Sequence, residues 1–502
     1  MYLPIENPTD LIVTRPVHQV LSRLFTGYRH LVLQRELNKG FSGGRVIQVR
    51  PVNTLGLPEL PLVVKVAAIS QIQKEWHAYG AHVKNRLPGV PDIPRPPAYL
   101  PQAGLGGICY NLVGYGIFEL TNLADYLRSD GVQAMDMHRT VEHIRRMMHF
   151  IWDWSQEQSA FRPDSSYDRL LPVHLLVHHD TTVAAKAPRL VTPHMRPDPP
   201  IEPGEFVRLR SFAVHKANWA THTITLKRPY VRFNESDYFV RCRSLHDERI
   251  AGYHVDEIGP EICGVVTETR ESRLRSEVIN AFADEIDPTL DTFALPDPYL
   301  GYRLPNPLSV YEQVLSTTRP VRVAPIHGDL NLDNVLIEKE TGKVHLIDFA
   351  ETRHDHVLHD LLRLEAEAIT KLLSKLIADR HLNPISTLLS LYRLLHEELL
   401  GEHDDEHPPA SANLSSIWIM LSFVRRTART YLFDPTDVSE YYQGLFIYML
   451  GYMKFKNLNT MAEAPLPKQL AFWGAAIAYV YMTGQFEQYL YHITESNGEV
   501  VQ

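Results

Sequence analysis

The stretch that decides the fold is VRVAPIHGDLNLDNVLIEKETGKVHLIDFAE, residues 321–351. Its second half holds two short apolar runs, VLI at 335–337 and VHLI at 344–347, which the turn ETGK joins. Short apolar runs bounded by turn residues are typical of strands. The pattern predicts two short strands beside a polar loop, HGDLNLDN at 327–334, with an aspartate directly after the second strand.

The polar side chains of this stretch suit phosphoryl transfer. That reaction needs little covalent work from a protein, because magnesium neutralises the phosphate charge and a carboxylate orients the attacking oxygen. Asp329, Asn334 and Asp348 offer two carboxylates and an amide oxygen for these tasks. A surface turn rich in Asn and Asp is the plainer explanation of the loop by itself. Such a turn does not, however, predict an apolar strand that ends in Asp-Phe at this distance.

In composition, order and spacing, the HGD at 327–329, Asn334 and the IDF at 347–349 resemble the HGDxxxxN and IDF elements of the aminoglycoside phosphotransferase superfamily. Its members are the small-molecule relatives of protein kinases. The resemblance implies an α+β, bilobal protein-kinase-like fold, with a β-rich N-lobe and a helical C-lobe, that binds ATP and Mg²⁺. HGD stands where protein kinases have HRD, and DFAE where they have DFG, so both departures point away from protein kinases themselves.

The resemblance also implies a role for each residue of the motif. Asp329 is the expected catalytic acceptor for the proton of the substrate hydroxyl. Asn334 and Asp348 are the expected magnesium ligands, since this hard cation prefers oxygen. His327 is expected to brace the loop through a side-chain hydrogen bond. Asp360 is expected to tie down the same loop, although a carboxylate in the first turn of a helix explains it equally well.

A second signal is Lys65, the single cation of the apolar strand LPLVVKVA at 60–67. A buried cation is costly unless it meets negative charge. By the resemblance, Lys65 contacts phosphate, and Glu75 on a helix predicted over 70–84 holds its ammonium in place. Considered separately, an edge-strand lysine and a helix-surface glutamate are the commoner situations for these residue types.

The remaining nucleotide contacts are expected from backbone rather than from side chains. Glycines let N–H groups approach phosphate oxygens closely, and the loop GFSGGR at 40–45 lies between two predicted strands. The same residues serve ordinary hairpin turns, and the loop is not the GxGxxG of protein kinases. The hinge beside adenine is predicted around Val113 and Tyr115. The expected loop contacts are Gly40, Ser42, Gly43 and Gly44.

Composition shifts divide the chain into four parts. They are an N-terminal extension at 1–30, the N-lobe with the first C-lobe helices at 31–158, an inserted β-rich domain at 159–304, and the rest of the C-lobe at 305–502. Regular alternation in EFVRLRSFAV and HTITLKRPYVRF predicts short strands in the insert, as in a small OB-like barrel or a sandwich. After the catalytic loop, apolar residues at three-and-four spacing predict a helical bundle.

Two groups of residues in the insert are candidates for a functional site. HLLVHHD contains His174, His178, His179 and Asp180 but has no second ligand cluster with zinc-like spacing, so strand and turn are the preferred interpretation. Alternating arginines near aromatic residues could form an oligonucleotide-binding face. A solvated strand face is the plainer explanation, because many acidic residues share the segment. The residues concerned are Arg208, Arg210, Arg241 and Arg243, with Phe212, Trp219 and Phe239.

The composition limits the class of protein. The 502 residues are 44% hydrophobic and 22% charged, values typical of globular proteins. A net charge of -9 disfavours wholesale coating of nucleic acid or an anionic membrane. The three cysteines are widely separated, the N-terminus lacks a signal-like pattern, and the apolar run at 471–482 is too short to cross a bilayer. A cytoplasmic location and no membrane partner are therefore expected.

Two functional hypotheses follow. The first is an ATP- and Mg²⁺-dependent phosphotransferase that acts on a hydroxyl of a small molecule or a protein, which the sequence does not identify. The second is a nucleotide-binding scaffold, weak or inactive in catalysis, in a bacterial signalling or defence assembly. The large insertion and the DFAE sequence motivate the second hypothesis.

Overall fold

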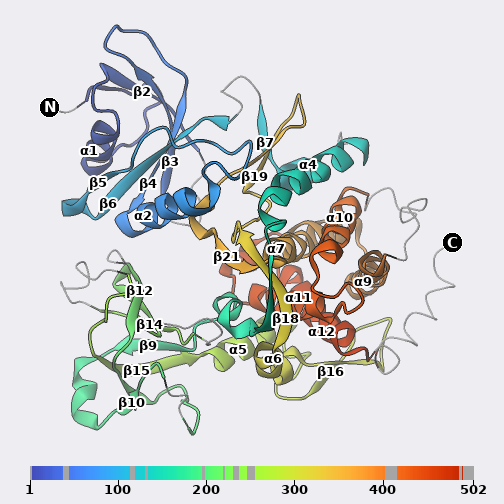
Figure 1. The fold of residues 1–502 in the computed structure, drawn as a ribbon. Coiled ribbons are helices and arrows are strands. Elements are labelled where there is room, and N and C mark those ends of the chain that lie inside the picture. Colours follow the sequence, from blue (N-terminus) through green and yellow to red (C-terminus); the bar gives the residue numbers. More distant parts are fainter. Residues whose placement is uncertain are drawn as a thin grey trace. The chain divides into compact units, whose positions relative to one another are not determined.

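The computed structural model describes residues 3–37, 44–113, 119–129, 134–194, 198–218, 221–229, 237–245, 255–401, 415–485 and 489. The chain divides into two compact units. The first comprises residues 1–155, 324–360 and 411–420, and the second comprises residues 156–323, 361–410 and 421–502. Figure 1 labels the elements of both units.

The first unit is built on a six-stranded sheet with the order β1-β2-β3-β4-β6-β5. β1 and β2 run parallel, and the other neighbours are antiparallel. Residues rich in Val, Ile and Leu form the central strands, as expected for side chains that pack well on a pleated surface. The strands are β1 (Ile5–Glu6), β2 (His30–Leu37), β3 (Arg45–Val52), β4 (Leu62–Ala68), β5 (Ala98–Leu100) and β6 (Leu105–Asn111).

The sheet packs a different helix against each of its faces (Figure 1). Side chains of a strand alternate between faces, so Leu62, Val64 and Val66 of β4 join the core against α1 (Arg15–Leu24). Lys65 therefore points to the opposite face, where α2 (Ile69–Ala78) contacts β4 and β6. The first thirty residues, expected to be a separate extension, supply both β1 and α1 to this sheet and its core.

The predicted strand pair after the polar loop is a hairpin of β19 (Val335–Glu338) and β20 (Val344–Leu346). Val335 lies opposite Leu346, and β7 (Leu120–Asn122) pairs with the other edge of β19. The first unit also contains a short 3-10 helix directly after Asp348. Its remaining elements are α3 (Leu123–Arg128), α4 (Ala134–Trp152), the π-helical turn Tyr79–Val83, the 3-10 helix η9 (Phe349–Glu351) and β21 (Arg353–His356).

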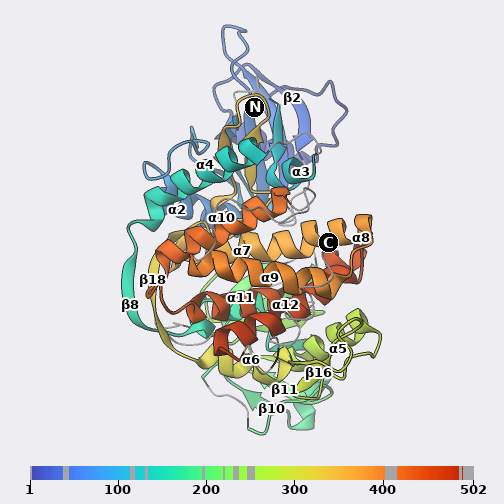
Figure 2. The ribbon, with the colours of Figure 1, turned by 90° about the vertical axis from the view of Figure 1, so that its right-hand side faces the viewer.

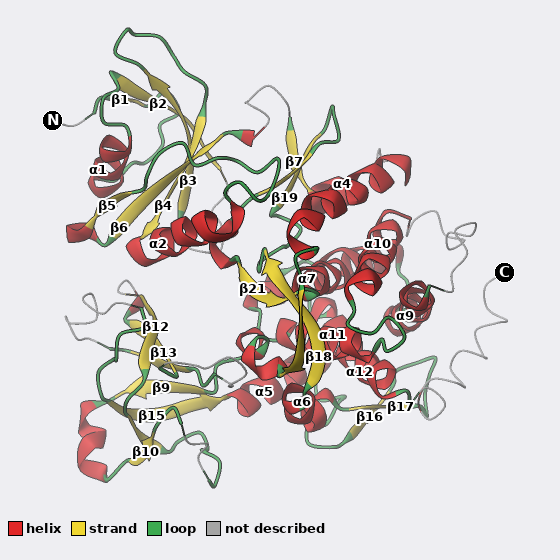
Figure 3. Ribbon diagram, viewed as in Figure 1, coloured by secondary structure: helices red, strands yellow, loops and turns green. Residues whose placement is uncertain are grey.

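The second unit contains a seven-stranded sheet, within the segment predicted to be an inserted β domain (Figure 3). Two neighbouring pairs, β10–β11 and β9–β14, are parallel. Among the described residues, the edge strands β10 and β12 are not paired with each other, so these strands form an open sheet. The sequence had suggested a small OB-like barrel or a sandwich. In sheet order the strands are β10 (Arg189–Val191), β11 (Phe206–Leu209), β15 (Ile262–Thr269), β9 (Leu175–His179), β14 (Val240–Arg243), β13 (Thr223–Lys227) and β12 (Ala213–Asn218).

Helices form the rest of the second unit, and Figure 2 shows α9, α11 and α12 side by side. Local signals set several boundaries: Thr269 and Ser272 form a capping box at the start of α5, and Asn383 caps α9 before a proline. α12 is apolar around most of its circumference and is buried accordingly. The helices are α5 (Arg270–Phe282), α6 (Pro307–Ser316), α7 (His359–Glu367), α8 (Ser374–Arg380), α9 (Pro384–Leu400), α10 (Ser415–Tyr431), α11 (Ser439–Tyr452) and α12 (Leu466–Thr483). Two short strand pairs accompany them, β8 (Gln156–Phe161) with β18 (Arg319–Ile326) and β16 (Thr292–Ala294) with β17 (Arg303–Pro305).

The predicted fold class is confirmed: a β-rich first part and a helical last part are separated by a β-rich segment. Within the described part of the chain, none of the helices combines the length and apolar character needed to span a membrane.

Candidate functional site

Lys65 lies between two carboxylates in the first unit. Its Nζ atom is 2.9 Å from Glu75 Oε2 and 3.0 Å from Asp348 Oδ1. Glu75 comes from α2, and Asp348 comes from the residue pair that follows β20. Three residues that the sequence placed in one site are thus in direct contact, although Lys65 and Asp348 are 283 positions apart.

Burial and charge act in opposite directions on this group. Burial by itself lowers the pKa of the Lys65 ammonium, but the carboxylates of Glu75 and Asp348 outweigh it and raise that pKa above its usual value. Burial also raises the pKa of Glu75, and the Lys65 ammonium opposes that rise. Because both carboxylates face one cation, the ammonium is protonated throughout the physiological pH range.

Two contacts of this cluster were not anticipated from the sequence. The Tyr110 hydroxyl on β6 donates a hydrogen bond to Glu75, and the exposed Lys74 pairs with Glu351. Tyr110 shares the α2 face of the sheet, because Cys109 before it belongs to the core against α1. A polar aromatic residue at the end of an apolar strand was the only signal for it.

The polar loop is shaped by its own asparagines. Asn334 donates from Nδ2 to the Asp329 carbonyl at 2.8 Å, and Asn331 Nδ2 lies 3.3 Å from Asp329 Oδ2. The Asn331 side chain also accepts hydrogen bonds from the Asp333 and Asn334 N–H groups. These bonds fix the Asp329 backbone and leave its carboxylate half-buried at the surface of the loop.

The hairpin brings Asn334 next to the segment that carries Asp348. The N–H of Ile347 donates to the Asn334 carbonyl at 3.1 Å, immediately before Asp348. Asp348 has φ 64° and ψ 69°, in the left-handed region that aspartate adopts more readily than most residues. This conformation ends β20 and starts η9, so the Asp348 side chain leaves the strand direction and meets Lys65.

His327 and Asp360 brace the loop from the inside. The fully buried Asp360 accepts hydrogen bonds from the His327 and Gly328 N–H groups, both at 2.8 Å. His327 Nε2 donates to the Ile347 carbonyl at 3.0 Å, and its ring packs 4.9 Å from that of Phe349. Both bracing contacts expected from the resemblance are therefore present. Of the two explanations for Asp360, the structure favours the loop contact.

Gly328 is required by this packing, which gives a stability prediction. Its φ is +80°, and a Cβ atom there would lie 2.2 Å from the Glu351 carbonyl oxygen and 2.5 Å from Arg353 Nη1. Gly342 has a similar φ of +68° with nothing within 4 Å. We expect Gly342→Ala to cost about 1 kcal/mol from backbone strain alone, and Gly328→Ala to cost roughly 2 kcal/mol more because of the clash. Urea unfolding midpoints of the two variants check this, and equal losses would contradict it.

Asn334 and Asp348 fit a magnesium ion by their chemistry. Since Asn334 Nδ2 is held by the Asp329 carbonyl, its amide presents the oxygen as the remaining ligand atom. Asp348 uses Oδ1 for Lys65 and retains its second carboxylate oxygen for a metal. Magnesium sites in phosphoryl transfer typically use a few oxygen ligands from the protein, and oxygen atoms of phosphate and water complete the coordination.

The other predicted nucleotide contacts are only partly described. Gly40, Ser42, Gly43 and Tyr115 lie outside the described residues. Gly44 stands at the start of β3 against β4, where a Cβ atom would be 3.2 Å from that of Ala67. Val113 follows β6 and is half-buried. The roles of all these residues stay predictions.

The interpretation of HLLVHHD as strand and turn is confirmed. His178 and His179 end β9, Asp180 caps the following 3-10 turn, and His174 stacks on Tyr238. Across the described ranges, no group of three metal-binding side chains is found. On the predicted arginine face, Arg208 and Arg210 approach Glu261, Phe212 and Phe239 are buried, and Trp219 is not described.

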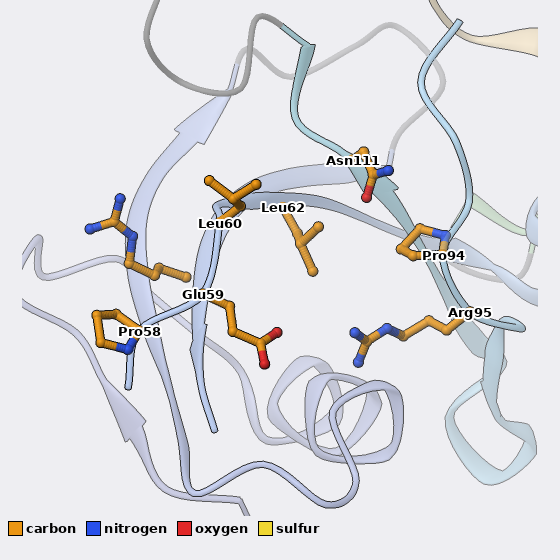
Figure 4. Close-up of a pocket in the computed structure, with 8 residues that line it drawn as sticks. Pro58, Glu59, Leu60, Leu62, Pro94, Arg95 and Asn111 are labelled. Atoms are coloured by element: carbon orange, nitrogen blue, oxygen red, sulfur yellow. The ribbon is translucent and has the colours of Figure 1, made fainter. Parts of the chain in front are cut away.

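The first unit also has an open cavity of about 770 Å³ that is separate from Lys65. Leu62 lines it, and the parity of β4 places Leu62 on the face opposite Lys65. Figure 4 shows Glu59 and Arg95 reaching into this cavity from two sides. The Arg95 guanidinium lies over the Phe25 ring at 4.7 Å. This cavity therefore does not include Lys65.

Several similar solved structures are described as phosphotransferases or kinases. An amicoumacin kinase bound to AMP-PNP, Ca²⁺ and Ami is 9% identical, with a TM-score of 0.35, covering 91% of this chain and 93% of that one. A thermostable mutant of aminoglycoside phosphotransferase APH(4)-Ia is 10% identical, with a TM-score of 0.35 and coverages of 93% and 98%. A type I macrolide 2'-phosphotransferase is 12% identical, with a TM-score of 0.31 and coverages of 93% and 99%. Similarities of this size carry no argument about activity.

Among curated proteins, none matches the chain significantly. A family model described as ternary complex associated domain 9 matches residues 29–454. The match spans the polar loop, the seven-stranded sheet and most of the helical part. The chain therefore belongs to the ternary complex associated domain 9 family.

Proposed function

We propose that this protein is an ATP- and Mg²⁺-dependent phosphotransferase that transfers a terminal phosphoryl group to a hydroxyl of an acceptor still to be identified. The observation that supports it most is the contact of Lys65 with both Glu75 and Asp348, beside the loop that carries Asp329 and Asn334. Phosphoryl transfer requires a phosphate-binding cation, metal ligands and an orienting carboxylate. Lys65, Asn334 with Asp348, and Asp329 are our candidates for these three functions.

Each residue has a distinct task in this proposal. Asp329 orients the acceptor hydroxyl and takes its proton as the oxygen attacks. Asn334 and Asp348 hold the metal through oxygen atoms. Lys65 binds phosphate oxygens, and Glu75 keeps its ammonium aligned. When bound, magnesium neutralises the phosphate charge that builds up during transfer.

Substitution of Lys65 tests its roles in ATP binding and in the stability of the fold. Lys65→Met leaves the buried Glu75 carboxylate, whose side chain is 2% exposed, without its cation. We expect a loss of about 3 kcal/mol in unfolding free energy and a raised Kd for ATP. The matched control is Lys74→Met, next to Glu75 on α2, which removes an exposed ion pair with Glu351 and should cost under about 1 kcal/mol. Urea unfolding measures the loss of stability, and ATP titration measures the Kd. Equal effects of the two substitutions would contradict the proposed role of Lys65.

The activity itself is tested by incubating the protein with labelled ATP, Mg²⁺ and pools of hydroxyl-bearing acceptors, including small alcohols, sugars and proteins. Mg²⁺-dependent transfer of label, lost in Asp348→Asn, supports the proposal. Binding of ATP with neither transfer nor hydrolysis in any pool contradicts it.

The second candidate is a nucleotide-binding scaffold within a multi-protein assembly. The family description, which refers to a ternary complex, favours this alternative. The large insertion and the DFAE sequence also fit a protein that binds ATP without transferring phosphate. Assembly that depends on ATP and survives Asp329→Asn supports the scaffold, whereas assembly that is indifferent to ATP argues against it.

A further inference from the structure

The open cavity of about 770 Å³ in the first unit lies beside three neighbouring strands of the six-stranded sheet. β3, β4 and β6 contribute Arg50, Leu62 and Asn111, and Leu62 stands directly opposite Asn111 in the sheet. The segments that precede β4 and β5 supply the rest of the lining, which is Pro58, Glu59, Leu60, Pro94 and Arg95. The cavity thus combines an apolar wall with two guanidinium groups and one carboxylate.

Uncharged groups hold the Arg95 guanidinium in position. Its Nη1 atom donates to the Leu24 carbonyl at 3.2 Å, and Nη2 donates to the Tyr28 hydroxyl at 3.1 Å. The guanidinium lies 4.7 Å from the Phe25 ring centre and 5.1 Å from that of Tyr28. Each Nη atom carries two N–H groups, so these contacts use one donor of each and leave the other for a ligand.

The same tyrosine holds the Glu59 carboxylate. The Tyr28 hydroxyl donates to Glu59 Oε2 at 3.0 Å while it accepts from Arg95. Among the described residues, Glu59, Arg95 and Arg50 take part in no ion pair, either with one another or with other side chains. Figure 4 shows the Glu59 carboxylate and the Arg95 guanidinium pointing toward each other across the cavity. Two opposite charges therefore face the same space without pairing.

Hydrogen bonds also fix the backbone that carries the carboxylate. Asn53 Oδ1 accepts from the N–H groups of Leu55 and Leu57, both at 3.0 Å. The Glu59 N–H donates to the Pro51 carbonyl at 2.9 Å. Because the charged groups are already in place, a ligand that meets both of them loses little free energy to the ordering of the protein.

We propose that this cavity binds a zwitterionic small molecule, an α-amino acid with an apolar side chain. The ligand carboxylate accepts hydrogen bonds from Arg95, and the ligand ammonium donates to Glu59. A simple anion would leave the Glu59 carboxylate facing a like charge, whereas a zwitterion satisfies both groups. The apolar side chain packs on Leu62 and on Leu60, which is 61% exposed. This site is independent of the proposed phosphotransferase activity.

L-leucine and three related compounds test each part of the proposal by calorimetric titration of the whole protein at pH 7.5. We expect L-leucine to bind with a Kd at or below about 1 mM. N-acetyl-leucine lacks the ammonium, leucinamide lacks the carboxylate and glycine lacks the apolar side chain. Each should bind at least about tenfold more weakly. The first two also resemble the C-terminal and N-terminal residues of a peptide, so they distinguish a free amino acid from a protein terminus.

Variants localise the binding to the cavity. Glu59→Gln, at an exposed position, should weaken L-leucine binding about tenfold and leave N-acetyl-leucine binding unchanged. Arg95→Gln should weaken the binding of both compounds about tenfold, and urea unfolding reports whether its fold is intact. The matched control is Glu6→Gln, which removes the same charge from β1, outside the cavity, where the side chain is 63% exposed. Glu6→Gln should bind L-leucine as the unmodified protein does.

Several results would overturn the proposal. Absence of L-leucine binding, or equal effects of Glu59→Gln and Glu6→Gln, would show that the cavity is not the site, even if Arg95→Gln fails to fold. Binding of N-acetyl-leucine or leucinamide as tightly as L-leucine would replace the zwitterion by the C-terminus or the N-terminus of a protein. Equally tight binding of glycine would contradict the packing of an apolar side chain on Leu60 and Leu62.

Discussion

Replacing Asp329 by asparagine is expected to lower kcat by a factor of about 100 to 10,000, the usual contribution of a positioned general base. The variant keeps the size of the side chain and an oxygen that can accept from Asn331. Under the proposed function, the asparagine can no longer take the proton of the acceptor hydroxyl. Asn334 contacts only the backbone carbonyl of residue 329, so its own position is unaffected. ATP binding should therefore remain near that of the unmodified protein.

The measurement is single-turnover transfer alongside ATP titration of the same samples. Asp333→Asn is the matched control, because it removes one carboxylate from an exposed position of the same loop and should retain most of the activity. Turnover by Asp329→Asn equal to that of the control would remove Asp329 from the mechanism. A parallel loss of ATP binding would mean that the substitution disturbed the loop.

Removing Arg425 is expected to destabilise the second unit by about 3 to 5 kcal/mol, the cost of leaving a buried charge unpaired. Arg425 on α10 and Glu365 on α7 are both 0% exposed in their side chains, with contacts of 2.8 and 2.6 Å between them. Tyr441 donates to the same carboxylate, and the guanidinium lies 4.8 Å from the Tyr441 ring centre. Arg425→Met leaves the buried Glu365 carboxyl group without its cation within this aromatic environment.

Urea unfolding of Arg425→Met, Glu365→Leu and the double variant tests the cause of the destabilisation as well as its size. The double variant should be more stable than either single one, because it leaves no unpaired charge. Arg275→Met is the control, since it breaks an exposed i,i+4 pair with Glu271 and should cost under about 1 kcal/mol. Additive losses in the double variant would show that packing, and not the unpaired charge, sets the cost.

Sequence reasoning was most successful where the signal is local. The hairpin at 335–346 follows from two short apolar runs around a turn, and its register places Asn334 beside Ile347. A continuous apolar run predicted the strand that carries Lys65, and alternation predicted the short strands of the β-rich segment. It could not predict the parallel pairs β9–β14 and β10–β11, because pairing between strands distant in sequence leaves no period in the chain.

The grouping of Lys65, Glu75 and Asp348 came from a resemblance and not from any pattern within the residues. Spacing alone cannot connect positions that are 283 residues apart. The same holds for Arg425 with Glu365, which come from separate helices. Each of these depends on charges that meet only after helices and strands have packed.

By itself, the sequence determined the local helices and strands and the types of side chain in the polar loop at 327–334. Periodicity and turn residues act over only a few positions. The tertiary structure alone decided which carboxylates surround Lys65 and which N–H groups Asp360 binds. The physical reason is that Coulombic and hydrogen-bond energies depend on distance in space, and the fold sets that distance between residues far apart in the chain.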